Sequence, residues 1–213
     1  MYTPAPFKLD DVAEAHALMR AAPFAILVTA GGDGLTATHV PTVLKVDATE
    51  PMGRLECHLA RANPQWRTFA PDTEALAIFQ GPEAYIRPGW YPSKAEHGKV
   101  VPTWNYAVVH AYGRLEAVDD KAWLLGHVDE LTRQQERQLD APWSTADAPA
   151  GFLDAIARGI VGLRLRITRL EGKAKMSQNR DARDRAGVID GLDRGDAGDR
   201  ATAALVEELN RRT

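Results

Sequence analysis

The chain contains a single cysteine, Cys57, among its 213 residues. One thiol cannot form an intramolecular disulfide, and it cannot build a cysteine-based zinc cluster within one chain. A disulfide-held fold is therefore excluded, and a reducing compartment is expected. Met1 is followed by Tyr2-Thr3-Pro4 instead of a basic stretch and an apolar run, so the pattern of a secretory signal is missing. We expect a cytoplasmic protein.

Long hydrophobic runs and a strong net charge are also missing. The longest uncharged, apolar-looking stretch, residues 100–113, is shorter than the ~18–20 residues that span a bilayer and contains Asn105 and His110. The 26 Lys and Arg side chains are set against 29 Asp and Glu, giving a net charge of −3 and a pI near 6.1. Bulk electrostatic binding of nucleic acid usually needs a pI above ~9. The composition argues against that mode but leaves a local basic patch open.

Three common functional motifs are absent from the sequence. No Gly-x-Gly-x-x-Gly follows a predicted strand, and neither Gly-x-x-x-x-Gly-Lys-Ser/Thr nor His-Glu-x-x-His occurs. The sequence therefore gives no direct sign of a dinucleotide loop, a phosphate-binding P-loop or a zinc protease site.

The chain does contain the pattern of a β-rich protein with added helices. Apolar alternation between turn-forming residues predicts strands at residues 24–29, 35–40, 43–46, 54–60, 75–80, 84–87, 105–118 and 159–170. Apolar residues at helical spacing predict helices at residues 9–21, 119–139, 148–157 and 201–211, with a short one after Asn63, where Pro64 takes the first helical position. The predicted class is mainly β with helical additions (α+β), a barrel or curled sheet of six or seven strands.

The composition changes after Leu170. Residues 171–200 hold seven basic and seven acidic side chains and few apolar ones, which is typical of exposed helix faces or a flexible tail. We therefore predict a barrel domain with helical insertions over residues 1–170. A polar extension over residues 171–213, ending in a helix, would pack on the barrel or on a partner subunit.

The segment from Arg87 to Tyr106 has the highest density of chemically useful side chains. It holds four aromatic residues and three prolines together with Lys94, His97 and Lys99. A long loop between strands is usually disordered or functional, and aromatic residues disfavour disorder. A packed surface loop over one end of the barrel explains the same composition, and the two interpretations are about equally supported.

Two further clusters contain groups that bind anions. His58, Arg61 and Asn63 lie where a strand ends and a short helix begins, so a phosphate there would meet a guanidinium, an imidazole and free backbone amides. Alternatively, Asn63 only caps the helix and Arg61 faces water. The segment from Lys173 to Arg180 offers cations with hydroxyl and amide donors, although a charged run of this kind is more often a solvated linker.

These three clusters together carry a resemblance to a known family. Three motifs of this sequence resemble those of the PaiB-type FMN-binding negative transcriptional regulators. They are, in chain order, His58-x-Ala60-Arg61-Ala62-Asn63-Pro64-Gln65-Trp66, then Trp90-Tyr91-Pro92-Ser93-Lys94 with His97-Gly98-Lys99-Val100-Val101-Pro102-Thr103-Trp104-Asn105-Tyr106, and finally Lys175-Met176-Ser177-Gln178-Asn179-Arg180. The resemblance spans most of the chain.

The resemblance implies a Greek-key split β-barrel of the pyridoxamine-phosphate-oxidase-like superfamily, assembled as a homodimer with FMN along the interface. It places the FMN phosphate near Thr38, His58, Arg61 and Asn63. Lys94, His97 and Lys99 would lie on the substrate side of the flavin or simply decorate the loop. The residues placed near the flavin or the partner subunit are Lys175, Ser177 and Gln178.

Trp104 and Tyr106 occupy alternate positions of a predicted strand, so their side chains project from the same face. They would pack against the flavin ring or against the facing subunit, or they are core aromatics of the barrel. A homodimer is also favoured because Trp90, Tyr91, Trp104 and Tyr106 present more aromatic area than one small barrel hides readily.

Three functional hypotheses follow. The first is an FMN-binding homodimer that uses the flavin for redox chemistry or sensing, with an FMN-dependent oxidoreductase as its enzymatic form and no catalytic residue identified. The second is a DNA-binding repressor; however, the segment around residues 142–144, between the helices predicted at 119–139 and 148–157, is too long for a helix-turn-helix. The third is a haem protein with His97 or His110 as axial ligand.

Overall fold

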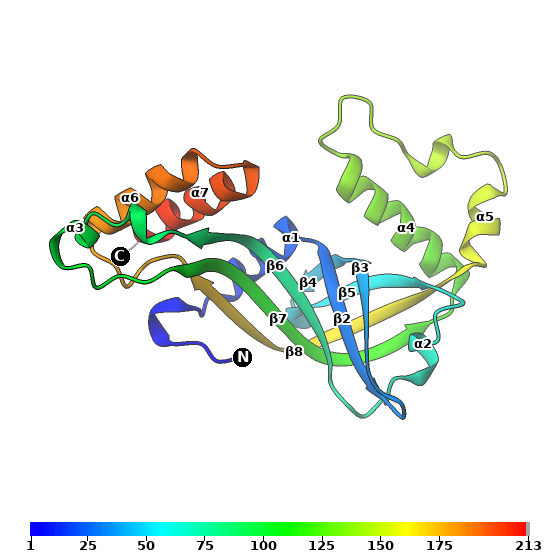
Figure 1. Cartoon of the computed structure of the whole chain (residues 1–213). Helices are drawn as coiled ribbons and strands as arrows, with labels where there is room; N and C mark the ends of the chain where they lie inside the picture. Colours follow the sequence, from blue (N-terminus) through cyan, green and yellow to red (C-terminus); the bar gives the residue numbers. More distant parts are fainter. Residues whose placement is uncertain (212–213) are drawn as a thin grey trace. The chain divides into compact units, whose positions relative to one another are not determined.

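The computed structural model describes residues 1–211 and shows one antiparallel eight-stranded sheet with helices added (Figure 1). The sheet order is β3-β2-β6-β7-β8-β5-β4, and β1 pairs with β8. The strands are β1 (Lys8–Leu9), β2 (Phe24–Gly31), β3 (Gly34–Pro41), β4 (Val43–Asp47), β5 (Glu50–Ala60), β6 (Ala75–Ile86), β7 (Thr103–Val118) and β8 (Ile160–Lys175). The predicted mixed α+β class is confirmed.

The α-helices are α1 (Val12–Ala21), α2 (Gln65–Thr68), α3 (Ser93–His97), α4 (Lys121–Glu136), α5 (Phe152–Ala157), α6 (Ala182–Asp193) and α7 (Ala197–Arg211). Short 3₁₀ turns lie at Ala5–Phe7 (η1), Pro88–Trp90 (η2) and Thr145–Asp147 (η3). No helix within residues 1–211 combines the length and apolarity needed to cross a membrane.

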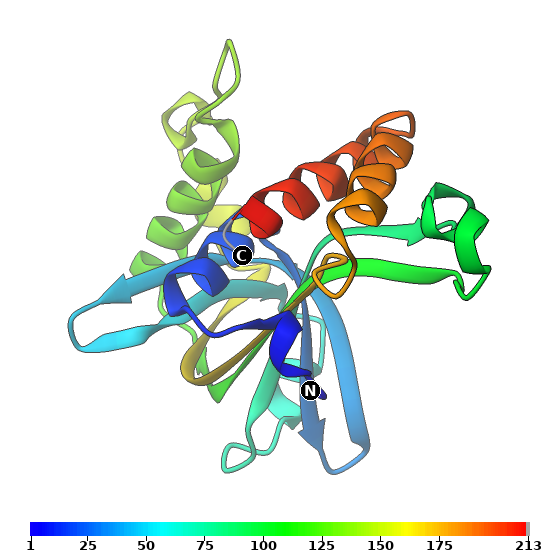
Figure 2. The ribbon, with the colours of Figure 1, turned by 90° about the vertical axis from the view of Figure 1, so that its left-hand side faces the viewer.

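The chain forms two compact units. Unit 1 contains Met1–Leu18, Gln80–Val109 and the chain from Glu171 onward; unit 2 contains Met19–Phe79 and His110–Leu170. Both units can be followed in Figures 1 and 2 by the sequence colours. Each unit is described separately below.

In unit 2 the sheet curls, so that β3 approaches β5 although the two strands lie far apart in the strand order. Gln65 of α2 is completely buried, and its amide nitrogen donates to the carbonyl oxygens of Leu27 and Thr36 and to the hydroxyl of Thr29, at 3.1–3.3 Å. This side chain ties the β2–β3 hairpin to the short helix. Cys57 of β5 is buried as well, and burial raises the pKa of its thiol to about 12.

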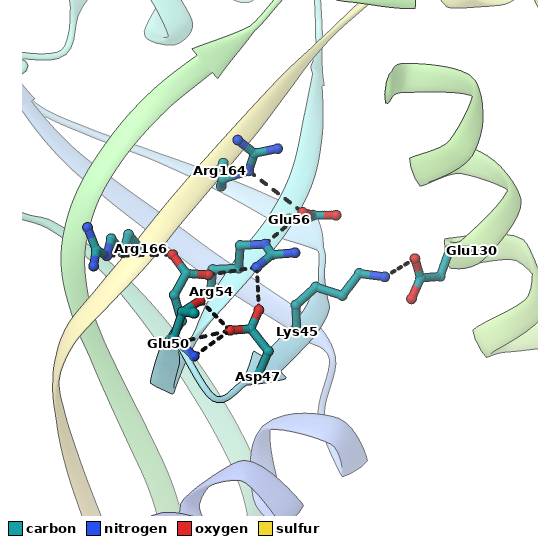
Figure 3. Close-up of polar contacts among 9 residues, drawn as sticks. Lys45, Asp47, Glu50, Arg54, Glu56, Glu130, Arg164 and Arg166 are labelled. Atoms are coloured by element: carbon teal, nitrogen blue, oxygen red, sulfur yellow. Dashed lines mark hydrogen bonds and ion pairs between the residues drawn. The ribbon is translucent and has the colours of Figure 1, made fainter. Parts of the chain in front are cut away.

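Helix α4 packs on the face formed by β4, β5 and β8 of unit 2. Lys45 of β4 pairs with Glu130 of α4 (Figure 3). Gly162 of β8 leaves the space that the Trp123 ring fills, because a Cβ at that position would lie 2.1 Å from the ring atom Cζ3. The absence of one side chain therefore sets how closely this helix approaches the sheet.

A network of charged side chains covers the neighbouring part of the same face (Figure 3). The Arg54 guanidinium contacts Asp47 at 3.0 Å, Glu50 at 2.6 Å and Glu56 at 3.1 Å. Arg164 extends the network from Glu56, at 3.7 Å. The hydrogen bonds from Thr49 lower the pKa of Asp47 to about 2, so this carboxylate stays charged within the network.

In unit 1, helices α6 and α7 lie side by side and cover one face of the β6, β7 and β8 segments (Figures 1 and 2). The core under them consists mainly of aliphatic side chains. Its fully buried members include Ile86, Ala107, Met176, Val188, Leu192 and Val206.

Sequence expectations for two regions need correction. The strands predicted at residues 75–80 and 84–87 are one strand, β6, because β2 pairs only with residues 76–78 and Pro82 falls on an unpaired edge. The segment 173–180 is not a solvated linker, since β8 continues to Lys175, and residues 171–200 are not a flexible tail, since α6 buries Val188 and Leu192. These two residues are four apart and share one helix face.

Candidate functional site

The ten predicted site residues fall in both units. Four of them, Thr38, His58, Arg61 and Asn63, belong to unit 2. The other six, Lys94, Trp104, Tyr106, Lys175, Ser177 and Gln178, belong to unit 1.

Asn63 is a local structural residue of unit 2. Its side-chain oxygen accepts a hydrogen bond from the backbone N–H of Gln65 at 2.9 Å, although α2 begins at Gln65 with Pro64 in the cap position, one residue after the predicted start. Its amide nitrogen donates to the Thr38 hydroxyl at 3.2 Å. The structure thus brings Thr38 and Asn63 together, as a hydrogen-bonded pair between β3 and the α2 turn.

Arg61 is held by groups of its own chain. Its guanidinium makes two hydrogen bonds to Asp119, at 2.6 and 2.8 Å, and donates to the carbonyl oxygens of Arg158 and Ile160, both at 2.9 Å. The hydrogen bond from Arg61 lowers the pKa of Asp119. A phosphate at Arg61 would have to replace a carboxylate that already sits there, so the phosphate role of this residue stays a prediction.

His58 contacts a second histidine that the sequence analysis did not single out. Its Nδ1 lies 3.1 Å from Nε2 of His127 on α4, and the His127 ring stacks on Trp123 with centroids 5.2 Å apart. Burial lowers the pKa of His58, and it lowers that of His127 to about 4, with further contributions from His58 and Lys45. Both rings are therefore neutral near pH 7 and provide no charge for an anion.

The unit 2 residues thus form three separate pairs and not one phosphate cradle: Thr38 with Asn63, Arg61 with Asp119, and His58 with His127. Within residues 1–211, no group of three or more His, Cys, Asp or Glu side chains is arranged to hold a metal ion.

In unit 1, aromatic side chains gather on the face of the sheet opposite α6 and α7. Trp104 is 51% exposed and meets the edge of Tyr85, which is 45% exposed, with ring centroids 5.9 Å apart. Tyr106 follows at the alternate position of β7, and its ring lies 5.1 Å from Nζ of Lys173. Trp104 is therefore not the core aromatic that the sequence also allowed. We call Tyr85, Trp104 and Tyr106 the aromatic face.

Lys175 brings positive charge to this face. Its ammonium group donates to the Thr103 hydroxyl and to the backbone carbonyl of Trp104, the latter at 2.7 Å. Burial lowers the pKa of Lys175, and the charges of Lys173 and Arg180 lower it further. No carboxylate pairs with Lys175 in the part of the chain that the structure describes. A lysine whose charged form is disfavoured by two neighbouring cations is suited to an anionic ligand.

Ser177 and Gln178 shape the turn after β8. Ser177 has a φ of 60°, is buried, and its hydroxyl hydrogen-bonds the Asn105 side chain at 3.0 Å. Gln178 accepts from the backbone N–H of Met176 at 2.6 Å and donates to the carbonyl of Ala174 at 2.7 Å. Both side chains are engaged locally, so their predicted place near a flavin stays a prediction.

Lys94, His97 and Lys99 lie on and directly after α3 and are exposed. His97 accepts a hydrogen bond from the backbone N–H of Lys99 at 3.0 Å. The segment is anchored to α6 by Ser93, whose hydroxyl and backbone N–H bond Asp184 at 2.7 and 3.1 Å. The predicted loop is thus ordered, and it carries Lys94 with no acidic partner among residues 1–211.

The sequence analysis did not single out Tyr85 or His127, and it named Asn105 and Lys173 only as members of longer segments. Tyr85 lay in a predicted strand, but only strand pairing reveals that it meets Trp104. His127 is 69 residues from His58, and no local pattern predicts contact over such a separation.

The curled antiparallel sheet with its helices and the aromatic, cationic face define the class of FMN-binding split barrels. The family model described as "Putative FMN-binding domain" matches residues 1–169. An uncharacterised protein of Aspergillus fumigatus is 34% identical over 201 residues, covering 75% of this chain and 77% of the relative. The protease synthase and sporulation protein PAI 2 of Bacillus subtilis is 32% identical over 192 residues, covering 90% and 89%.

Solved structures share the fold. The FAD- and haem-binding protein of Mycobacterium smegmatis superposes with a TM-score of 0.60 at 16% identity, covering 84% of this chain and 78% of that one. The chain belongs to the PaiB-type family of FMN-binding domains, and FMN is its cofactor. The residues of unit 1 fit FMN, since the exposed rings suit a flat heterocycle and the ammonium group of Lys175, which has no carboxylate partner within residues 1–211, suits a phosphate.

Proposed function

We propose that this chain is a homodimeric flavoprotein that uses FMN for redox chemistry or sensing, with the flavin ring against the aromatic face and the phosphate drawn to Lys175. The observation that carries the proposal is the exposed Trp104 ring next to Lys175, whose ammonium group has no carboxylate partner within residues 1–211. Burial lowers the pKa of Lys175 and the charges of Lys173 and Arg180 lower it further, so a bound phosphate would favour the charged form of this amine. When bound, FMN supplies hydride or electron transfer, and the protein supplies orientation and electrostatics.

The residues of the chain have binding and orienting roles in this proposal. Trp104 and Tyr106 provide flat apolar contact, while Lys175 provides charge and is itself fixed by Thr103. Lys94 lies on the neighbouring α3 segment as a group for an anionic substrate. The roles of Ser177 and Gln178 are to hold the turn that positions Lys175.

Dimer formation is supported by apolar side chains at the surface. Trp104 and Val101 of unit 1 are 51% and 65% exposed, and Phe24 and Leu35 of unit 2 are 63% and 80% exposed. Large exposed apolar groups are typical of interaction surfaces, and twofold symmetry is the commonest arrangement of identical chains. A second copy is therefore the partner that we propose.

The proposal is tested by measuring bound flavin in purified protein. We expect a flavin absorbance spectrum and about one FMN per chain. Lys175→Gln should weaken FMN binding about tenfold or more, because a hydrogen bond to a charged group is worth about 1.5–3 kcal/mol. Trp104→Ala should weaken it as well.

Arg61→Gln is the matched comparison. It removes a cation that already pairs with Asp119, so we expect the flavin content to be retained. If Arg61→Gln lost FMN and Lys175→Gln retained it, the phosphate site would be at Arg61 and not at Lys175. Protein that takes up no FMN would contradict the whole proposal.

A DNA-binding repressor is the second candidate, and one observation favours it. Helices α6 and α7 are joined by only three residues, Arg194–Asp196, including Gly195, which is the connection of a helix-turn-helix. However, Glu207 and Glu208 are exposed on α7, and acidic side chains outnumber basic ones over the two helices. We expect weak binding without sequence preference; a salt-dependent, high specificity ratio for one promoter would favour the repressor instead.

A further inference from the structure

A groove of about 410 Å³ lies in unit 1, beside the edge of β6 and the turn between α6 and α7. Its size is within the range of small-molecule sites, about 300–1,000 Å³. The lining side chains combine aromatic rings with charges of both signs. They are Tyr85, Arg87, Trp90, Arg194 and Asp199, with Gly191 and Gly195 between them.

Two glycines allow the walls of this groove to pack closely. A Cβ at Gly191 would lie 2.3 Å from Cδ2 of Trp90, so the indole ring packs directly on the helix backbone. A Cβ at Gly195 would lie 2.0 Å from Oδ2 of Asp199, so the carboxylate occupies the room that a side chain would take. The turn thus presents an indole and a carboxylate to the same groove.

Arg87 provides the free positive charge of the groove. It is exposed, its guanidinium lies 5.7 Å from the Trp90 ring centroid, and no carboxylate pairs with it within residues 1–211. Arg194 pairs with Asp190 one turn earlier on α6, and both side chains are mostly exposed. Because an exposed pair of this kind is worth little, an incoming anion can compete for Arg194.

We propose that this groove binds a purine nucleoside monophosphate. The phosphate would be held by the Arg87 and Arg194 guanidinium groups, whose planar forks suit phosphate oxygens. Trp90 and Tyr85 would contact the base, and Asp199 would accept hydrogen bonds from an amino or hydroxyl group of the ligand. Tyr85 also belongs to the aromatic face, where it meets Trp104, so Arg87, Trp90, Arg194 and Asp199 are the residues that separate this groove from the proposed flavin site.

The test uses AMP, adenosine and inorganic phosphate as probes on the purified, flavin-loaded protein. Isothermal titration calorimetry should show saturable binding of AMP, with adenosine and inorganic phosphate each about tenfold weaker or more. Phosphate that binds as tightly as AMP would contradict a site that uses the base. Absence of saturable AMP binding would contradict the site itself.

Arg87→Gln should weaken AMP binding about tenfold or more, since it removes a charged hydrogen-bond donor from an exposed position without disturbing the core. Arg137→Gln is the control, because Arg137 lies in unit 2, at the end of α4, and also has no ion-pair partner among the described residues. Equal AMP affinity of the Arg87→Gln and wild-type proteins would overturn the proposal. Release of FMN on addition of AMP, followed by flavin absorbance, would place AMP in the flavin site and overturn it too.

Discussion

The imidazole of His127 is 2% exposed, and burial lowers its pKa to about 4 from an ordinary value near 6.5. The unfolded chain therefore binds a proton more readily than the folded chain between these pH values. The stability associated with the neutral ring is complete above about pH 6.5 and is lost as the pH falls toward 4. Its upper limit is about 3 kcal/mol.

Urea unfolding at pH 7.5 and pH 5 measures this effect. The wild-type protein should lose more stability on acidification than His127→Gln, because glutamine can still donate a hydrogen bond to His58 but does not titrate. The same pH dependence in both proteins would show that His127 does not control acid stability.

At the residue scale, the sequence could predict local hydrogen bonds but not distant partners. The bond from the Gln65 backbone to Asn63 follows from spacing alone, because it joins neighbours in the chain. Asp119 is 58 residues from Arg61, and its contact with Arg61 depends on strand pairing that no short pattern encodes. The predicted phosphate site at Arg61 was therefore chemically reasonable, but in the structure the Arg61 guanidinium binds Asp119 of the same chain.

At the scale of elements, the contact between Ser93 and Asp184 fixes the α3 segment on α6. Both side chains are at most 5% exposed. Ser93→Ala leaves a buried carboxylate with one hydrogen bond fewer, and we expect it to lower the free energy of unfolding by about 1–2 kcal/mol. Urea denaturation measures the change.

The control for this contact is Glu96→Gln. Glu96 and Arg183 join the same two elements at 2.7 Å, but both are exposed, so the expected loss is below about 1 kcal/mol. If Glu96→Gln were the more destabilising change, the buried bond would not be the main anchor of α3.

Glycine positions give a second prediction for an element, the packing of α4. Gly162→Ala places a Cβ inside the Trp123 ring, so we expect a destabilisation of about 1–3 kcal/mol. Gly126→Ala on α4 meets no atom within 4 Å and should stabilise by about 0.5–1 kcal/mol through helix propensity. Thermal or urea unfolding of the two variants should therefore shift in opposite directions.

The sequence predicted most elements but not where long strands continue. Gly81 and Pro82 look like a strand break, yet β6 passes through them because that stretch is an edge. Helix α6 was not predicted because most of its side chains are charged or small and only a narrow stripe of apolar residues faces the core. Turn-forming residues mark local geometry, whereas the extent of an element depends on its neighbours in space.

At the scale of the whole molecule, we predict that two copies associate. Light scattering coupled to size exclusion at micromolar concentration should give about twice the chain mass of 23.3 kDa. The physical reason is that each unit exposes large apolar side chains, Trp104 in unit 1 and Leu35 in unit 2, whose contact with water is unfavourable. A mass of one chain would contradict the homodimer.

The β-rich class of the molecule followed from alternation in the sequence, because each strand has one buried face. The strand order did not follow from alternation: β5 pairs with β8, which begins 100 residues after the end of β5. The resemblance to a known family provided the split barrel, and the structure provided the partners of each residue. The chemical role of a site residue can therefore be predicted only when its long-range contacts can also be predicted.

The buried Cys57 of β5 can report how often this part of the protein opens. Because its thiol is protonated and covered in the native state, a maleimide or aromatic disulfide reagent reacts only when the surrounding strands separate. The chain has no second thiol to react in the background. The labelling rate therefore measures the frequency of transient openings of β5 in the unmodified protein. Any bound molecule that stabilises this region will lower the labelling rate.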